Sequence, residues 1–314
     1  MKAQRNVWGD TLAALAKEDR RVIVLDGDLA TSTQAVKVAD QVPEAFVEIG
    51  IAEANMVGVA FGLSTLGYRP WLSTFGVFLS SRALDQIRIG VSQTKAPVRV
   101  AAAYAGLLNG SSGKTHQDIE DLAVMRALPN MTVLAAADEH ELAAMMRWAA
   151  DYDGPVYMRV ARDAVPEVFD AAYRFEPGRV HELRQGRDVT LVSTGVQTSR
   201  VLQAADLLSQ AGTQAKVVHV PSLKPVDADA LLRSLAGSPL VVTVEEHSVL
   251  GGLGGMVAEI VSGAGLAVRV ARHGLADAWS ESAPNDFLLD KYGLSPQRVA
   301  ERVADLCARS AQAA

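Results

Sequence analysis

The sequence predicts an α/β protein of two domains, each a mostly parallel sheet flanked by helices. Short apolar runs rich in β-branched residues alternate with longer helical patterns along the 314 residues. The strand-like runs are apolar almost throughout, and a polar segment interrupts the alternation once. Strands that are apolar on both faces are typical of parallel sheets covered by helices on both sides.

The first part of the chain contains four strand-like runs. In order they are "RVIVLDG" (21–27), "VRVAAAYA" (98–105), "TVLAAA" (132–137) and "VYMRVA" (156–161). Helical patterns lie between them. In the pattern at 138–151, Asp138 is the expected N-cap, and Glu141 follows three residues later, the spacing of a capping box.

The second part repeats the alternation. Its strand-like runs are "DVTLVSTG" (188–195), "AKVVHVP" (215–221), "PLVVTVEEH" (239–247) and "LAVRVAR" (266–272). Between the two parts, residues 168–188 are polar, contain Pro177 and Gly178, and have no clean period. That composition is typical of a linker. We therefore expect one domain over 1–170, a linker over 171–187 and a second domain over 188–314.

Composition excludes several classes of function. A formal charge of −6 argues against a nucleic-acid partner, which would require a basic face. Cys307 is the one cysteine, so neither a disulfide framework nor a cysteine-based zinc site is expected. The N-terminus lacks a signal-peptide pattern, and no window approaches the apolar length of a membrane span. We expect a cytoplasmic protein without a membrane partner.

The segment "GIAEANMVGVAFG" (50–62) places Glu53 at the start of an apolar helical pattern. A charged, unpaired carboxylate buried there would cost several kcal/mol, although a helix N-terminus tolerates it best. Gly58 and Gly62 lie four residues apart, and each costs about 1 kcal/mol of helix propensity relative to alanine. We therefore expect another group to approach this helix closely at the two glycines. The spacing alone favours a second helix packed against it.

Two further segments contain candidate site residues. Phe75 and Phe78, in "WLSTFGVFLSSRALDQIR" (71–88), lie among small residues; such rings suit a flat heterocycle, although core packing explains them equally well. His116 follows the strand-like run at 98–105, in a Gly/Ser loop, and loops at the carboxyl ends of parallel strands bind ligands. His116 is therefore a better candidate than the four histidines in apparent surface or helix settings, at 140, 181, 219 and 273.

Two glycine-rich stretches miss known nucleotide-binding patterns. A phosphate loop at "GSSGKT" would require glycine at position 108, where Leu108 stands. A dinucleotide fingerprint at "GGLGG" (251–255) would require glycine at Val257. The second stretch is expected to be a tight turn between a strand and a helix.

Several motifs together resemble one family. "GIAEANM", "STFGVFLSSRALDQIR", "GKTHQDIEDLAVMRALPNMTVLAAADEHE" and "VYMRVARD" are similar to the pyrimidine-binding domain of the transketolase group of thiamine-diphosphate enzymes. "LVSTG" and "EEHSVLGGLGG" are similar to the C-terminal domain of that group. The resemblance spans essentially the whole chain and keeps the order of the motifs.

One family motif is missing. The family holds the cofactor diphosphate and Mg²⁺ with a Gly-Asp-Gly motif followed by an asparagine, in a separate N-terminal domain. The segment "DGD" at 26–28 has the same residue types in a different order and does not match that motif. The resemblance therefore implies the C-terminal subunit of a split, two-chain transketolase. It also implies thiamine diphosphate as cofactor, Mg²⁺ (or Ca²⁺) ligated by an N-terminal partner subunit, no metal ligands in this chain, and an α₂β₂ heterotetramer.

The resemblance also implies roles for particular residues. Glu53 corresponds to the catalytic glutamate that hydrogen-bonds ring nitrogen N1′ of the aminopyrimidine and favours its imino tautomer, which then removes the thiazolium C2 proton. Phe75 and Phe78 correspond to residues that stack on the aminopyrimidine. Asp28 corresponds to an aspartate at the cofactor interface, and His116 to a histidine close to the reacting carbon.

The expected substrate side departs from the family. Arg5, Ser32 and Arg162 fall where transketolases bind the substrate phosphate. Ser112, with its neighbour in "GSSG", replaces the acids of the usual "GEDG", and Tyr104 replaces a histidine. We expect ketol transfer from a ketose to an aldehyde, with an atypical sugar or aldehyde acceptor unless another residue compensates.

Three other interpretations remain open. The β subunit of a 2-oxo acid dehydrogenase has the same two domains, but it lacks the "THQDIEDLAVMR" segment seen here. A 1-deoxyxylulose-phosphate synthase shares the loop but is normally one fused chain. A non-catalytic scaffold with a decayed site is opposed by the joint presence of Glu53, Phe75, Phe78 and His116.

Overall fold

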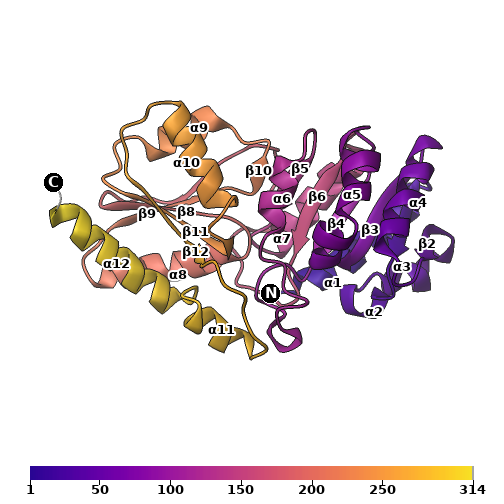
Figure 1. The fold of residues 1–314 in the computed structure, drawn as a ribbon, viewed down its shortest axis with the longest axis horizontal. Helices are drawn as coiled ribbons and strands as arrows, with labels where there is room; N and C mark the ends of the chain where they lie inside the picture. Colours follow the sequence, from indigo (N-terminus) through magenta and orange to yellow (C-terminus); the bar gives the residue numbers. More distant parts are fainter. Residues whose placement is uncertain (313–314) are drawn as a thin grey trace.

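A computed structural model describes residues 1–312 of the chain. It contains two sheets, of seven and five strands, which lie side by side and are covered by helices (Figure 1). Most strand pairs are parallel. The α/β class and the two helix-flanked sheets predicted from the sequence are confirmed.

The larger sheet has the strand order β10-β5-β6-β4-β3-β1-β2. All its pairs are parallel except that between β10 and β5. Its strands are β1 Val22–Asp26, β2 Phe46–Glu48, β3 Arg69–Phe75, β4 Arg99–Ala103, β5 Thr132–Ala135, β6 Val156–Val160 and β10 Ser222–Lys224. The strand β10 comes from the second half of the chain, so the halves share this sheet.

Helices cover both faces of the larger sheet (Figure 1). One apolar cluster is built around α1 and α7, and another around α4 and the irregular helices that follow β3. The bounds are α1 Gln4–Glu18, α2 Ala30–Thr33, α3 Val36–Gln41, α4 Glu53–Thr65, α5 Leu84–Gln86, α6 Asp121–Ala127 and α7 Glu139–Asp151; the 3₁₀-helices are η1 Pro43–Ala45 and η4 Gly110–Ser112, and the π-helices are η2 Phe78–Arg82 and η3 Ile87–Ser92. Asp138 caps α7 as predicted, accepting hydrogen bonds from the backbone N–H groups of His140 and Glu141.

The smaller sheet has the order β12-β11-β8-β9-β7. Its strands are β7 His181–Arg184, β8 Val189–Ser193, β9 Ala215–His219, β11 Val241–Ser248 and β12 Val270–Leu275, and its helices are α8 Gln197–Gln210, α9 Ala228–Leu235, α10 Leu253–Gly263, α11 Asn285–Lys291 and α12 Pro296–Gln312. The edge strand β7 lies inside the predicted linker and pairs antiparallel with β9. Its residues are half-buried or exposed, which explains why the segment lacks an apolar signature.

Buried polar contacts join the two halves. The carboxylate of Glu141, on α7, lies 2.9 Å from Nε2 of His219, on β9, and neither side chain is exposed. The expectation that His219 occupies a surface or helix position is therefore wrong, because β9 is an interior strand of the smaller sheet. The apolar cluster around α4 also includes side chains of α9 and α10, so the core is continuous between the halves.

No helix within residues 1–312 is both long enough and apolar enough to cross a bilayer.

Candidate functional site

The predicted site residues follow five adjacent strands, β6-β4-β3-β1-β2, whose carboxyl ends lie at one edge of the larger sheet. The chain reaches Asp28 after β1, Glu53 after β2, Phe75 and Phe78 at the end of β3, Tyr104 and His116 after β4, and Arg162 after β6. Because β2 and β3 pair with opposite sides of β1, the strand order reverses there. Such reversal points are where open α/β sheets bind ligands.

Four rings at this edge form an aromatic cluster: Phe75, Phe78, Tyr104 and His116. The Phe75 ring lies 4.5 Å from Tyr104 and 5.9 Å from Phe78, measured between centroids. The imidazole of His116 meets both phenylalanines edge-on, at 5.8 Å from Phe75 and 5.5 Å from Phe78. All four residues were predicted as site residues, Tyr104 on the substrate side, and the structure brings their rings together.

Glu53 is the first residue of α4, and its side chain is 1% exposed. Its Oε2 accepts a hydrogen bond of 2.7 Å from Arg82. Its Oε1 is buried and has no hydrogen-bond partner within the described part of the chain. A buried carboxylate oxygen without a donor is costly, and Oε1 is therefore an unused hydrogen-bond acceptor among the described residues.

Arg82 was not predicted as a site residue. Its guanidinium carbon lies 4.5 Å from the centroid of the Phe78 ring, so Arg82 connects Glu53 with the aromatic cluster. The available signal was its position four residues after Phe78, the spacing at which side chains of one helix meet. The segment forms the π-helix η2, an irregularity often found at functional sites.

Two arginines converge on Tyr104. The guanidinium of Arg5 donates a hydrogen bond of 3.0 Å to the Tyr104 hydroxyl, which in turn donates to the carbonyl of Ser32. The guanidinium carbon of Arg162 lies 5.7 Å from the Tyr104 ring centroid. Nε of Arg5 and Nε of Arg162 are buried without partners among the described residues. The predicted substrate residues Arg5, Ser32 and Arg162 therefore all lie against Tyr104, and two of them bring guanidinium groups.

The N-terminal end of α1 positions Arg5. The backbone N–H of Arg5 donates to the carbonyl of Ala161, directly before Arg162. The neighbouring Gln4 is buried and bridges two strands, accepting from the Ala161 N–H and donating to the carbonyl of Ala136. These contacts hold Arg5 beside Arg162 although the two residues are far apart in sequence.

Two predicted residues make no described contact with the aromatic cluster. Asp28 is exposed, has left-handed backbone (φ 63°), and donates its N–H to Glu48. The Ser112 hydroxyl donates to Asn109 at 2.9 Å, and the side chain is exposed. Asp28 and Ser112 follow the same strands as the other candidates, but both are exposed and neither is bonded to another predicted site residue among residues 1–312.

Two buried acids lie within two residues of predicted site residues in the sequence. Asp118, two residues after His116, accepts a hydrogen bond of 2.7 Å from Ser80 on η2, so it ties the histidine loop to the Phe78 segment. Burial and the neighbouring Asp121 raise the pKa of Asp118 well above its usual value. Burial also raises the pKa of Asp26, at the end of β1, to about 7. Neither acid was predicted, because their burial depends on how distant segments pack.

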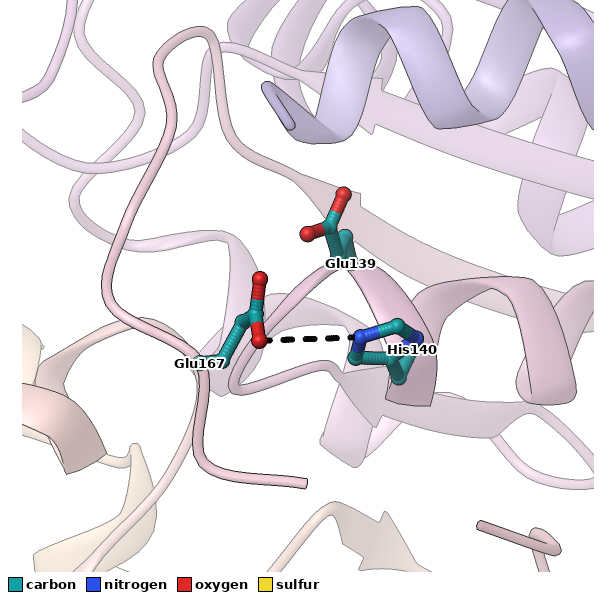
Figure 2. A group of neighbouring side chains, drawn as sticks. All are labelled: Glu139, His140 and Glu167. Carbon is teal, nitrogen blue, oxygen red and sulfur yellow. Dashed lines mark ion pairs between the residues drawn. The ribbon is translucent and has the colours of Figure 1, made fainter. Parts of the chain in front are cut away.

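A separate group of potential metal ligands comprises Glu139, His140 and Glu167 (Figure 2). The chain's N-terminal ammonium lies 3.3 Å from the carboxylate of Glu139 and 2.9 Å from that of Glu167. Hydrogen bonds to Glu167 and Glu139 raise the pKa of this ammonium. Glu139, His140 and Glu167 lie apart from the aromatic cluster in the chain, and Glu167 is exposed, so we build no proposal on them.

The chain is similar to known proteins over its whole length. It matches the family described as transketolase, pyrimidine binding domain, over residues 1–167, and the transketolase C-terminal domain over 178–299. The putative transketolase C-terminal section of Methanocaldococcus jannaschii is 38% identical, covering 97% of this chain and 96% of that protein. The 6-deoxy-6-sulfo-D-fructose transketolase subunit of Clostridium sp. (strain MSTE9) is 34% identical, covering 97% and 94%.

A solved structure described as a split gene transketolase, inactive beta4 tetramer, is also similar. It is 44% identical, has a TM-score of 0.89, and covers 97% of this chain and 98% of its own. This similarity agrees with the two helix-flanked sheets and with the order of the sequence motifs.

Proposed function

Because the chain belongs to the transketolase family of thiamine-diphosphate enzymes, we propose that it is the C-terminal subunit of a split transketolase. In this role it supplies the pyrimidine side of a cofactor site completed by an N-terminal subunit. The observation that carries the proposal is Oε1 of Glu53, which is buried without a partner among residues 1–312 and is linked through Arg82 to the aromatic cluster. The complex transfers a two-carbon ketol unit from a ketose to an aldehyde.

The residues present fit thiamine diphosphate. Glu53 would hold the hydrogen bond to ring nitrogen N1′ of the aminopyrimidine, and the rings of Phe75 and Phe78 would bind its flat face. When bound, the cofactor supplies a nucleophilic carbon and an electron sink for breaking the bond next to a ketose carbonyl. His116, edge-on to both phenylalanines, would exchange a proton with the substrate oxygen nearest the reacting carbon.

An anionic substrate fits the two guanidinium groups beside Tyr104. The Nε atoms of Arg5 and Arg162 are buried without partners among residues 1–312, and guanidinium binds phosphate-like anions in a bidentate way. The Tyr104 hydroxyl already donates to the Ser32 carbonyl, so Tyr104 orients Arg5 and leaves its guanidinium to meet the anion. The similar subunit from Clostridium carries a sulfo-sugar in its name, which is also an anionic substrate.

The acceptor differs from that of sugar-phosphate transketolases. Ser111 and Ser112 stand where those enzymes have two acids. This loop therefore has no carboxylate to accept a hydrogen bond from a sugar hydroxyl. Ser112 is exposed, so an incoming aldehyde can reach it. An acceptor with fewer hydroxyl groups near this loop is therefore favoured.

The outer face of α4 is the surface that the N-terminal subunit would cover. Ile51, just before α4, and Leu66, just after it, are 73% and 75% exposed. Gly58 and Gly62 are exposed, and no atom lies within 4 Å of an added Cβ at either position. No described element of this chain packs against the two glycines, contrary to the expectation of a neighbouring helix. The partner would supply that packing, the diphosphate contacts and the Mg²⁺ (or Ca²⁺) ligands, in an α₂β₂ heterotetramer.

The test is a ketol-transfer assay on the co-purified complex. The chain is expressed with an N-terminal transketolase subunit and assayed with a ketose phosphate donor and a panel of aldehydes with and without phosphate. Activity is expected only with both chains, and Ser112→Asp is expected to improve use of phosphosugar acceptors. Decarboxylation of a 2-oxo acid with transfer to a lipoyl group, without ketol transfer, would assign the chain to the dehydrogenases instead.

A further inference from the structure

The Glu53 carboxylate is bound asymmetrically. Oε2 is paired with Arg82 at 2.7 Å, whereas Oε1 is buried with no partner among residues 1–312. The Glu53 side chain is 1% exposed, but that of Arg82 is 48% exposed. The desolvation cost of this ion pair therefore falls mainly on Glu53, and removing the cation would leave a buried carboxylate without its partner.

Arg82 is the cation available to Glu53. The elements that contact α4 are β1, β3, η2, α5 and η3, and their charged side chains are Asp26, Arg69, Arg82, Asp85 and Arg88. Of these, only Arg82 forms an ion pair with Glu53 within the described chain. Arg69 pairs with Asp153 instead.

The position of Arg82 is itself fixed by the site. Its guanidinium carbon lies 4.5 Å from the Phe78 ring centroid, an attractive cation–π contact. Phe78 and Arg82 are the first and last residues of η2, and Ser80 between them is bound to the buried Asp118. One short element therefore carries both an aromatic ring of the cluster and the cation of Glu53.

We propose that Arg82 is a positioning residue for Glu53: it holds one carboxylate oxygen by a hydrogen bond and leaves the second oxygen as the acceptor for the cofactor ring. This role rests on the proposed function of Glu53. With Oε2 occupied, the carboxylate cannot rotate freely, so Oε1 stays directed toward its ligand.

Three variants at one surface separate this role from a structural one. Arg82→Met removes the charge and keeps much of the aliphatic length, Arg82→Lys keeps the charge, and Arg88→Met removes a nearby exposed cation with no described ion pair. In the complex, we measure how the rate of hydrogen–deuterium exchange at cofactor C2 depends on pH. In Arg82→Met, the acid limb of this pH profile is expected to move upward by about one pH unit or more. Arg82→Lys is expected to restore most of the shift, and Arg88→Met to match the wild type.

A second measurement uses the full chain without cofactor. Urea unfolding above neutral pH is compared for the wild type, Arg82→Met, Glu53→Gln and the double variant. Arg82→Met is expected to raise the unfolding equilibrium constant about tenfold more in the wild type than in Glu53→Gln, because only the former retains a buried charge. Equal effects in the two backgrounds would show that the pair is not coupled and would overturn the proposal.

A failure of the role proposed for Arg82 can be distinguished from a failure of the proposed function. If the wild-type complex exchanges the C2 proton and Arg82→Met keeps the same pH profile, the role of Arg82 is wrong while the proposed function stands. If the wild-type complex exchanges nothing, the proposed function is wrong, and the role of Arg82 falls with it. The urea cycle needs no cofactor, so it tests the ion pair independently of both results.

Discussion

At the residue scale, the site is defined by groups whose partners are incomplete. Glu53 has a free buried oxygen, and Arg5 and Arg162 each have a buried Nε without a partner in the described chain. Buried polar atoms are nearly always hydrogen-bonded in folded proteins. These three atoms belong to predicted site residues that contact, directly or through Arg82, the aromatic cluster, which is why we propose a ligand for them.

Replacing Glu53 by glutamine tests its proposed role. Gln occupies a similar volume but does not hold a proton as a carboxyl group does, so the complex is expected to fold and bind cofactor. C2 proton exchange is expected to fall by roughly 10² or more. Exchange is measured by NMR in D₂O, with the exposed Glu44→Gln as control. A Glu53→Gln complex that exchanges at the wild-type rate would remove Glu53 from this role.

The sequence located most site residues but not their partners. Phe75, Phe78 and His116 were predicted from their setting and from family resemblance, and the structure brings them together. Arg82 and Asp118 were missed, because each contacts a residue far away in sequence. Spacing within one segment carries no information about such pairs.

At the scale of elements, α4 has two glycines on its exposed side. Met56, Val57 and Ala60 are buried in the core, while Gly58 and Gly62 are exposed, with no described atom within 4 Å of an added Cβ. Interior glycines cost helix propensity, so their presence on an exposed face favours a close neighbour. The exposed face is therefore expected to be covered in the assembled enzyme.

The double substitution Gly58→Leu and Gly62→Leu tests this surface. The chain is expected to fold with stability equal to or above the wild type, because leucine has a helix propensity higher than that of glycine by about 0.8 kcal/mol per site and no atom obstructs it. Association with the N-terminal subunit is expected to weaken at least tenfold by calorimetry. Glu301→Leu, at an exposed position of α12, serves as control. Unchanged association of the glycine variant would place the partner elsewhere.

All eight strand-like runs became strands, but four strands were missed. The strand β3 was overlooked because Ser73 and Thr74 look polar, although both are buried and Ser73 bonds with Trp8 and Thr33. The strands β2 and β10 have three residues each, too short for a period to be read. The fourth, β7, lies in the polar segment that was predicted to be a linker.

At the scale of the whole molecule, buried charges link the two halves. Arg159, on β6, contacts Asp121 at 2.8 Å and donates to the Glu246 carbonyl, on β11. Next to Glu246, Glu245 accepts hydrogen bonds from Leu253 and Gly254 at the start of α10. Burial raises the pKa of Glu245 to about 7.

This raised pKa predicts a pH-dependent stability. Glu245 binds a proton more tightly in the folded chain than in the unfolded chain, so its stabilising effect is present below pH 4.5 and is lost as pH rises through 7. Glu245→Gln is expected to abolish this loss, which is up to roughly 3 kcal/mol. The free energy of unfolding is measured in urea at pH 5 and pH 8.

The change in the free energy of unfolding between pH 5 and pH 8 is compared between the wild type and Glu245→Gln. This difference is needed because burial lowers the pKa values of His181 and His247 to about 4, so these two groups make the chain more stable as pH rises. Glu259→Gln, an exposed position on α10, is the control. If the wild type and Glu245→Gln lose the same stability between the two pH values, Glu245 is not the responsible group.

The sequence predicted two α/β halves but not how they share structure. The crossing of β10 into the larger sheet depends on contacts between residues 222–224 and β5 that no local pattern encodes. The partner subunit was inferred from a missing motif, and the uncovered face of α4 is consistent with that inference.

Titration of thiamine diphosphate with Mg²⁺ by isothermal calorimetry tests the central claim most directly. The chain alone is expected to bind no cofactor tightly, and an equimolar mixture with the N-terminal subunit is expected to bind one cofactor per pair of chains. Tight binding by the chain alone would contradict the account, because it would show that this chain holds the diphosphate itself.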